Sequence, residues 1–90
     1  MRFTVTWTED AECALARIWL AADARRAVAE ASDHIDHELR RHADTSGEER
    51  FAGKRIFFVP PLAVFYDIST EDRIATVFDV WQYPSKDPDV

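Results

Sequence analysis

The chain has 90 residues with 17 acidic and 11 basic side chains, which give a formal net charge of -6 at pH 7. This length forms one domain, and 47% hydrophobic residues are enough to build a small core. The negative charge repels a polyanion and therefore disfavours a broad nucleic-acid-binding surface. No apolar run approaches the ~20 residues that span a bilayer, and the start lacks a signal-peptide layout, so we expect a cytoplasmic protein without membrane contact.

The N-terminal half of the chain predicts one strand followed by two helices. Phe3, Val5 and Trp7 alternate with polar residues, which predicts a strand over residues 2 to 7. Thr8 precedes an acidic turn and is a typical N-cap for a helix over residues 9 to 22. Asp23 is the expected cap of a second helix over residues 24 to 43. Apolar residues recur at helical spacing in both segments, so both helices should bury one face.

The only cysteine, Cys13, lies in the first predicted helix. A single cysteine allows no intrachain disulfide and no cysteine-based zinc site. The surrounding acids disfavour a reactive thiolate, so we expect a small thiol facing the core.

The C-terminal half predicts a three-stranded antiparallel meander. A polar loop over residues 44 to 49, with Gly47 near the end of the second helix, comes first. Apolar runs rich in β-branched and aromatic residues then predict strands near 54 to 59, 62 to 68 and 73 to 82. Pro60 and Pro61 lack N–H groups and should form the first turn. The segment from 84 to 90 is expected to be a flexible tail after a domain of residues 1 to 83.

These elements predict a single small α+β domain with two helices packed on one face of a mainly antiparallel sheet. In the strand near 62 to 68, one face carries the better core residues, which are Leu62, Val64, Tyr66 and Ile68. The other face carries Ala63, Phe65 and Asp67. Since two helices cover only one side of a small sheet, we expect this second face to be open or covered by a partner.

The order of elements, together with four short stretches, resembles the RelE/ParE toxin superfamily of bacterial type II toxin–antitoxin systems. The stretches are Trp7-Thr8-Glu9-Asp10-Ala11, Leu15-Ala16-Arg17-Ile18-Trp19, Ile35-Asp36-His37-Glu38-Leu39 and Pro61-Leu62-Ala63-Val64-Phe65-Tyr66-Asp67-Ile68. The resemblance covers residues 2 to about 83 and implies a toxin that an antitoxin wraps and neutralises. RelE-like members cut mRNA on the ribosome without a metal or other cofactor, whereas ParE-like members inhibit DNA gyrase.

The resemblance also implies where a ribonuclease site would lie. The family's acid falls near Glu48 or Glu49, its strand arginine falls on Ala63, and its terminal pair falls on Gln82 and Tyr83. Alanine removes the fixed positive charge, and a glutamine side chain cannot donate a proton as an imidazolium would. Lys54 or Arg55 could reach the same phosphate from the neighbouring strand.

The candidate catalytic residues are therefore Glu49, Lys54, Arg55, Gln82 and Tyr83, in a site that we expect to be degraded. The candidate partner-binding residues are Arg50, Ala63, Phe65 and Asp67. The basic cluster of Arg50, Lys54 and Arg55 has three interpretations, which are phosphate contacts, a site for an acidic antitoxin segment and ordinary surface charge.

The spacing of His34, Glu38 and His42 places all three on one helix face, where they could hold a metal. Three solvated side chains on an amphipathic helix explain the same pattern more simply, so no metal is expected.

The sequence thus favours the toxin-like member of a toxin–antitoxin pair with an antitoxin partner. Three alternatives remain open, which are a ribosome-dependent mRNA endonuclease using Lys54, Arg55 and Tyr83, a non-catalytic inhibitor of DNA gyrase, and an inactive interaction module.

Overall fold

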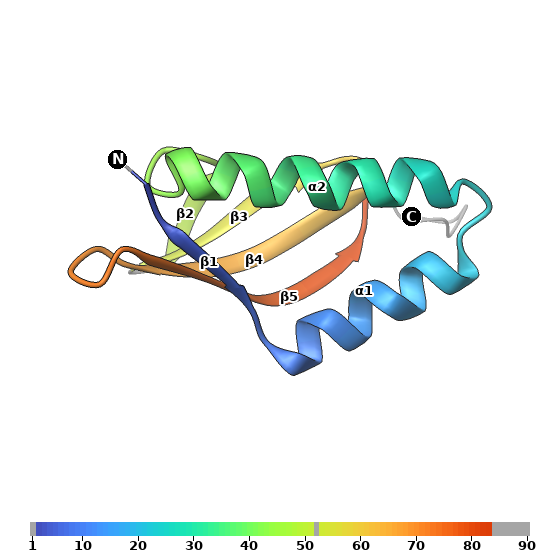
Figure 1. The fold of residues 1–90 in the computed structure, drawn as a ribbon, viewed down its shortest axis with the longest axis horizontal. Coiled ribbons are helices and arrows are strands. Elements are labelled where there is room, and N and C mark those ends of the chain that lie inside the picture. Colours follow the sequence, from blue (N-terminus) through green and yellow to red (C-terminus); the bar gives the residue numbers. More distant parts are fainter. Residues whose placement is uncertain (1, 52, 84–90) are drawn as a thin grey trace.

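The computed structural model describes residues 2–51 and 53–83. Within these ranges the chain forms two helices and five strands (Figure 1). Their order is β1 (Thr4–Trp7), α1 (Glu9–Ala21), α2 (Arg25–His42), β2 (Glu48–Phe51), β3 (Lys54–Val59), β4 (Leu62–Ser69) and β5 (Ile74–Gln82). The predicted α+β architecture is confirmed, and the predicted tail over 84 to 90 lies outside the described residues.

The strands form one sheet in the order β1-β5-β4-β3-β2. β1 pairs with β5 in parallel, and every other pair is antiparallel. The expectation of a loop over residues 44 to 49 was wrong in part, because β2 begins at Glu48. β2 is an edge strand with every residue exposed, so it carries no apolar alternation that would mark it as a strand.

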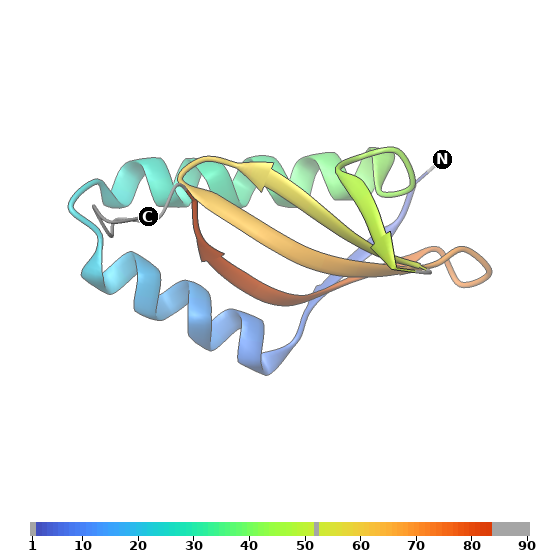
Figure 2. The same ribbon diagram turned by 180° about the vertical axis from the view of Figure 1, so that it is seen from behind.

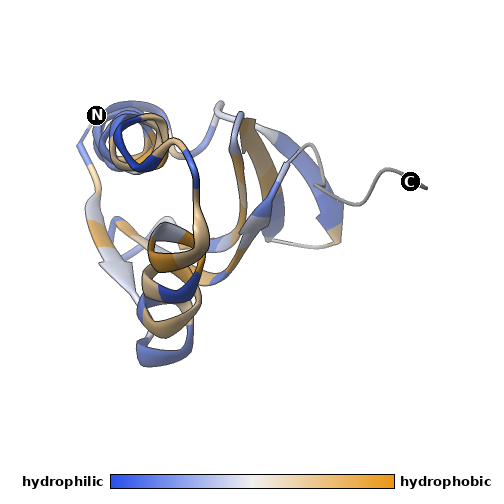
Figure 3. Cartoon of the chain, turned by 90° about the vertical axis from the view of Figure 1, so that its right-hand side faces the viewer, coloured by the Kyte–Doolittle hydropathy of each residue, from blue (hydrophilic) through white to orange (hydrophobic). Residues whose placement is uncertain are grey.

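Both helices pack on the inner side of the curved sheet, as Figure 3 shows in a view along α2. The buried cluster joins Ile35 and Leu39 of α2 to Val64 and Tyr66 of β4, and Leu15 of α1 packs against it. The predicted core is therefore confirmed. Cys13 lies outside the inward stripe of α1 and is exposed, so the expectation of a core-facing thiol was wrong.

The two helix starts differ in how they are capped. The Ala11 N–H donates to the Thr8 hydroxyl over 3.1 Å, as predicted. The prediction that Asp23 caps α2 was wrong, because Ala24 occupies the cap position and provides no side-chain cap. Arg25 instead closes the end of α1, where its guanidinium donates to the carbonyl oxygens of Trp19 (3.2 Å) and Leu20 (3.0 Å).

Gly47 lies at the entry to β2, where its φ of 66° is in the left-handed region. It was expected near the end of α2, but that helix ends at His42. A Cβ atom at position 47 would overlap the backbone carbonyl of Ile56 on the neighbouring strand. The close approach of β2 to β3 therefore requires glycine at this position.

Candidate functional site

Six aromatic side chains line the face of the sheet that the helices leave uncovered, which we call the open face. The members of this aromatic row are Phe51, Phe58, Phe65, Phe78, Trp81 and Tyr83. Phe65 is at its centre, with ring centroids 5.9 Å from Phe51, 5.1 Å from Phe78 and 6.4 Å from Trp81. In Figure 2, strands β2 to β4 lie in front of α2.

The second part of the aromatic row lies near the turn between β3 and β4. The ring of Tyr83 is 4.7 Å from that of Phe58, between ring centroids. The Tyr83 backbone N–H donates to the Pro61 carbonyl oxygen over 2.8 Å. This bond holds Tyr83 against the end of the hairpin, and its ring extends the apolar surface there.

A β-bulge in β5 adds Phe78 to the aromatic row. Phe65 pairs with Asp79, whereas the next residue, Tyr66, pairs with Val77, so one extra residue stands in β5. The bulge lets Val77 and Val80, three residues apart, both face the core. Phe78 then points to the open face and stacks on Phe65.

Ala63 lies on the open face, yet it is 0% exposed. Its register partners are Phe58 on β3 and Trp81 on β5, and directly paired residues share a face of the sheet. The two large side chains on either side explain how a methyl group on an open face loses contact with water. Phe65 is half-buried by its ring neighbours.

The charged residues of the open face are largely paired with one another. The Lys54 ammonium lies 3.6 Å from the Asp67 carboxylate and 5.5 Å from the Phe78 ring centroid. On β2, Arg50 lies 3.3 Å from Glu48. Exposed pairs of this kind contribute little to stability. They place charged groups beside the aromatic row, and the exposed Asp79, which is the register partner of Phe65, adds a carboxylate to the same face.

Arg55 belongs to the opposite face of the sheet, with its side chain 16% exposed. Its guanidinium donates to the carbonyl oxygens of Ser46 (2.9 Å) and Gly47 (3.1 Å), and it lies 3.9 Å from the Glu49 carboxylate. The chain between α2 and β2 is therefore held by Arg55. This role was not apparent from the sequence, where Arg55 was grouped with Arg50 and Lys54 in one basic cluster.

Tyr66 anchors the same connection from within the core. Its hydroxyl lies 2.5 Å from the Ser46 carbonyl oxygen and 2.9 Å from that of Ala43. Burial raises the pKa of the Tyr66 hydroxyl above its ordinary value, and the nearby Arg55 guanidinium partly offsets this rise. The phenol therefore stays protonated and serves as a hydrogen-bond donor.

The five candidate catalytic residues do not form one cluster, although Glu49 and Arg55 lie 3.9 Å apart. Gln82 pairs with Leu62 and lines a small pocket beside the connection between α1 and α2, on the helix side of the sheet. Arg55 also faces the helix side, with Glu49 beside it at the edge. Lys54 and Tyr83 share the open face, but Tyr83 contacts Phe58, four residues along β3 from Lys54, which is a spacing of about 13 Å.

The described residues contain neither a group of possible metal ligands nor a membrane-spanning helix. Among the described residues, no three His, Cys, Asp or Glu side chains form a group that could hold a metal ion, and this includes His34, Glu38 and His42. No helix in the described ranges is long and apolar enough to cross a membrane.

Sequence reasoning named Phe65 as a partner-binding residue and Tyr83 as a catalytic one, but missed the other four members of the aromatic row. Trp81 and Phe58 flank Ala63 in the register, so strand pairing alone would have found them. Phe51 lies on the unrecognised strand β2, and Phe78 faces outward only because of the bulge. No pattern in the sequence marks these last two positions.

Comparison with known proteins identifies the fold. No protein-family model and no curated protein sequence matches the chain. A chain of the toxin–antitoxin complex RelBE2 from Mycobacterium tuberculosis matches with a TM-score of 0.76 at 18% identity, over 94% of this chain and 95% of that one. A chain of the chromosomal ParDE toxin–antitoxin system from P. aeruginosa matches with a TM-score of 0.69 at 12% identity, over 90% of this chain and 96% of that one.

A third match is a chain of the archaeal RelE-RelB complex from Pyrococcus horikoshii OT3. Its TM-score is 0.56 at 17% identity, over 93% of this chain and 98% of that one. All three matches span nearly the full length of both chains, so the agreement concerns the whole domain. The chain therefore has the fold of chains found in RelBE and ParDE complexes, which confirms the RelE/ParE-like fold predicted from the sequence.

Proposed function

We propose that this protein is the toxin-like component of a type II toxin–antitoxin pair and that an antitoxin neutralises it. The observation that carries the proposal is the match, over nearly the whole of both chains, to a chain of a RelBE complex. The aromatic row supports it, because large apolar side chains gathered on one surface mark an interaction site, and Phe51, Phe58 and Tyr83 of this row are exposed.

The antitoxin covers the open face in this proposal. Aromatic side chains in a hydrophobic centre, ringed by charges, are the composition of a protein–protein interface. Phe65 supplies the centre, while Arg50 and Asp67 supply charges at its rim. Ala63 acts by its small size, which lets Phe58 and Trp81 close over it.

A pair of matched substitutions tests this surface. Phe51 on the open face and Leu20 on α1 are exposed to the same degree, at 61% and 62%. Phe51→Asp should abolish co-purification with the product of the adjoining reading frame when both are expressed, whereas Leu20→Asp should leave it intact. Equal retention of the partner by both variants would place the antitoxin elsewhere.

The ribonuclease site is degraded in this proposal. Ala63 and Gln82 stand where the resemblance expects an arginine and a protonatable residue. Losing one preorganised charge of this kind typically lowers a rate by about 10²- to 10³-fold. The placement of Lys54 and Arg55 on opposite faces supports the proposal, because only one of the two can approach a substrate on the open face.

The deciding experiment induces the gene with and without its adjoining reading frame. Growth arrest with intact mRNA, relieved by the neighbour, is the expected result, and a gyrase supercoiling assay then tests the protein target. Ribosome-dependent cleavage, mapped at mRNA 5′ ends and lost in Lys54→Ala or Tyr83→Phe, would favour the endonuclease instead. An absence of arrest would favour an inactive interaction module.

A further inference from the structure

Asp79 is an exposed carboxylate beside Phe65, the central ring of the aromatic row. The two residues are register partners, and directly paired residues of an antiparallel sheet share a face with their Cβ atoms about 5 Å apart. Among the described residues, no lysine, arginine or histidine side chain lies within ion-pair distance of Asp79. The open face therefore carries a negative charge that the described part of the chain does not neutralise.

The carboxylate of Asp79 is held in place through one of its two oxygens. Its Oδ1 atom accepts from the Val80 backbone N–H over 2.9 Å. Within the described ranges, its Oδ2 atom accepts no hydrogen bond. The side chain is thus oriented by the backbone of β5 and keeps one oxygen available to a donor from outside.

The same face already shows how a cation binds between a carboxylate and a ring. The Lys54 ammonium lies 3.6 Å from the Asp67 carboxylate and 5.5 Å from the Phe78 ring centroid. It therefore makes an ion pair and a cation–π contact at the same time. Asp79 and Phe65 repeat the combination of a carboxylate with an aromatic ring, but no cation from residues 2–51 or 53–83 accompanies them.

A second ring stands beside Asp79 along β5. Trp81 follows Asp79 by two residues on the same face, and its ring centroid lies 6.4 Å from that of Phe65 at an interplanar angle of 75°. Both rings are only partly buried. Asp79 is thus flanked by one aromatic side chain across the strands and by another along its own strand. Apolar neighbours of this kind strengthen an ion pair once a partner excludes water.

We propose that Asp79, Phe65 and Trp81 bind an arginine side chain of a protein partner. A guanidinium group is planar, donates hydrogen bonds to a carboxylate and stacks on aromatic rings, so it fits both parts of this site. Arginine is also among the residues that contribute most to binding when they lie in the centre of an interface.

The charge of the site favours a protein segment over a nucleic acid. Bases can stack on aromatic side chains, but their phosphates would meet the Asp79 carboxylate and a net charge of -6. A basic segment is attracted by both charges. This inference rests on the proposed function in one respect, which is that the antitoxin is taken to supply the arginine.

The test uses three synthetic peptides of about ten residues, which are long enough to cross the open face when extended. They alternate leucine with serine and differ only in the central residue, which is arginine, citrulline or glutamate. Citrulline has nearly the shape of arginine and carries no charge. Binding to the full chain is followed by NMR through the indole N–H signals of its three tryptophans.

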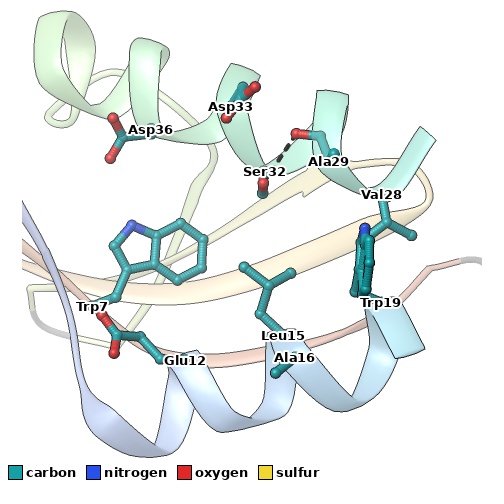
Figure 4. A pocket seen from close by; sticks show the side chains of 10 residues that line it. All are labelled: Trp7, Glu12, Leu15, Ala16, Trp19, Val28, Ala29, Ser32, Asp33 and Asp36. Atoms are coloured by element: carbon teal, nitrogen blue, oxygen red, sulfur yellow. Dashed lines mark hydrogen bonds between the residues drawn. The ribbon is translucent and has the colours of Figure 1, made fainter. Parts of the chain in front are cut away.

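The tryptophans provide an internal reference for the place of binding. Trp81 lies on the open face, whereas Trp7 and Trp19 line a groove between the two helices, on the other side of the sheet (Figure 4). The arginine peptide should shift the Trp81 signal and leave the other two unchanged. It should bind about five- to tenfold more tightly than the citrulline peptide, and more weakly at about 300 mM salt than at about 50 mM.

A substitution at Asp79 with a matched control separates the site from the overall charge. Asp79→Asn keeps the Oδ1 atom that accepts from the Val80 N–H, so β5 should be undisturbed. It should lower the affinity for the arginine peptide about five- to tenfold, to that of the citrulline peptide. Asp33 on α2 is also exposed and has no ion-pair partner among the described residues, but it lies beside the groove (Figure 4). Asp33→Asn should therefore change the affinity by less than about twofold.

Several results would overturn the proposal. These are equal binding of the arginine and citrulline peptides, an arginine peptide that leaves the Trp81 signal unshifted, and equal losses of affinity in Asp79→Asn and Asp33→Asn. An oligouridine of about ten nucleotides that binds at Trp81 more tightly than the arginine peptide would assign the site to a nucleic acid instead.

Failure of this site and failure of the toxin role are distinguishable. Peptide binding is measured on the purified protein and does not require toxicity. A protein that binds the arginine peptide through Asp79 but causes no growth arrest retains the site and loses the toxin role. A protein that arrests growth but does not distinguish arginine from citrulline loses only the site.

Discussion

Lys54 and Arg55 are neighbours in the sequence, but their side chains leave β3 on opposite faces of the sheet. Lys54 pairs with Asp67 at 3.6 Å on the open face. Arg55 donates to the Ser46 carbonyl oxygen at 2.9 Å on the helix face. The two cations therefore have different physical roles, one on an exposed surface and the other within the fold.

The first prediction separates these roles by stability. Arg55→Ala should lower the free energy of unfolding by about 1.5 to 3 kcal/mol, because the carbonyl groups of Ser46 and Gly47 lose a charged donor. Lys54→Ala should change it by less than about 1 kcal/mol, since the broken pair is exposed. Urea unfolding followed by tryptophan fluorescence measures both values.

The stabilities of Arg55→Ala and Lys54→Ala must be known before either variant is used in a toxicity assay. If Arg55→Ala abolishes growth arrest while it also unfolds the chain, the loss says nothing about catalysis. Equal stability of the two alanine variants would contradict the structural role that we assign to Arg55.

The second prediction concerns the Tyr66 hydroxyl. Tyr66→Phe should lower the free energy of unfolding by about 1 to 3 kcal/mol, because the buried Ala43 carbonyl loses its hydrogen-bond donor. Burial raises the folded-state pKa of this hydroxyl above the unfolded value of about 10. Its contribution should therefore be fully present below about pH 10 and should be lost as the pH rises through the folded-state pKa.

Unfolding free energies of wild type and Tyr66→Phe, measured in parallel between about pH 7 and pH 11, test this linkage. The difference between the two proteins should stay constant at neutral pH and shrink in the alkaline range. A difference that grows with alkaline pH would mean that the phenolate, not the phenol, is stabilised in the fold.

The sequence predicted those elements whose patterns arise within one segment. The apolar run that ends at Val59 and the helical stripe from Val28 to Leu39 each lie within one segment, and both elements were found close to their observed bounds. β2 could not be found in this way, because an edge strand of four exposed residues buries nothing and is defined only by its pairing with β3.

The site was harder to predict than the fold for a related reason. Residues 54 and 55 look like one basic cluster in the sequence. Their side chains lie on opposite faces of the sheet, because successive residues of a strand alternate between the two faces. Phe78 could not be placed by this alternation, because the β5 bulge interrupts it and turns the Phe78 side chain toward the open face. The aromatic row is assembled across four strands and the residue after β5, so it depends on register, which a single sequence does not show.

The third prediction concerns the core between α2 and the sheet. Leu39 is fully buried, so Leu39→Ala should lower the free energy of unfolding by about 2 to 5 kcal/mol. Leu20 is an exposed leucine on α1 and provides the control, since Leu20→Ala removes the same atoms from a solvated position. Chemical denaturation should show a change below about 1 kcal/mol for the control.

The fourth prediction compares the two glycines, which share a left-handed backbone conformation with φ of 66° at Gly47 and 74° at Gly53. Gly53→Ala meets no neighbouring atom, so it should cost only the conformational strain of about 1 to 2 kcal/mol. Gly47→Ala adds a collision with the Ile56 backbone, which cannot move aside without disturbing the pairing of β2 with β3. It should therefore cost clearly more than Gly53→Ala, and amide hydrogen exchange should show the loss of protection in β3. Equal costs at the two positions would mean that β2 lies farther from Ile56 than the structure places it.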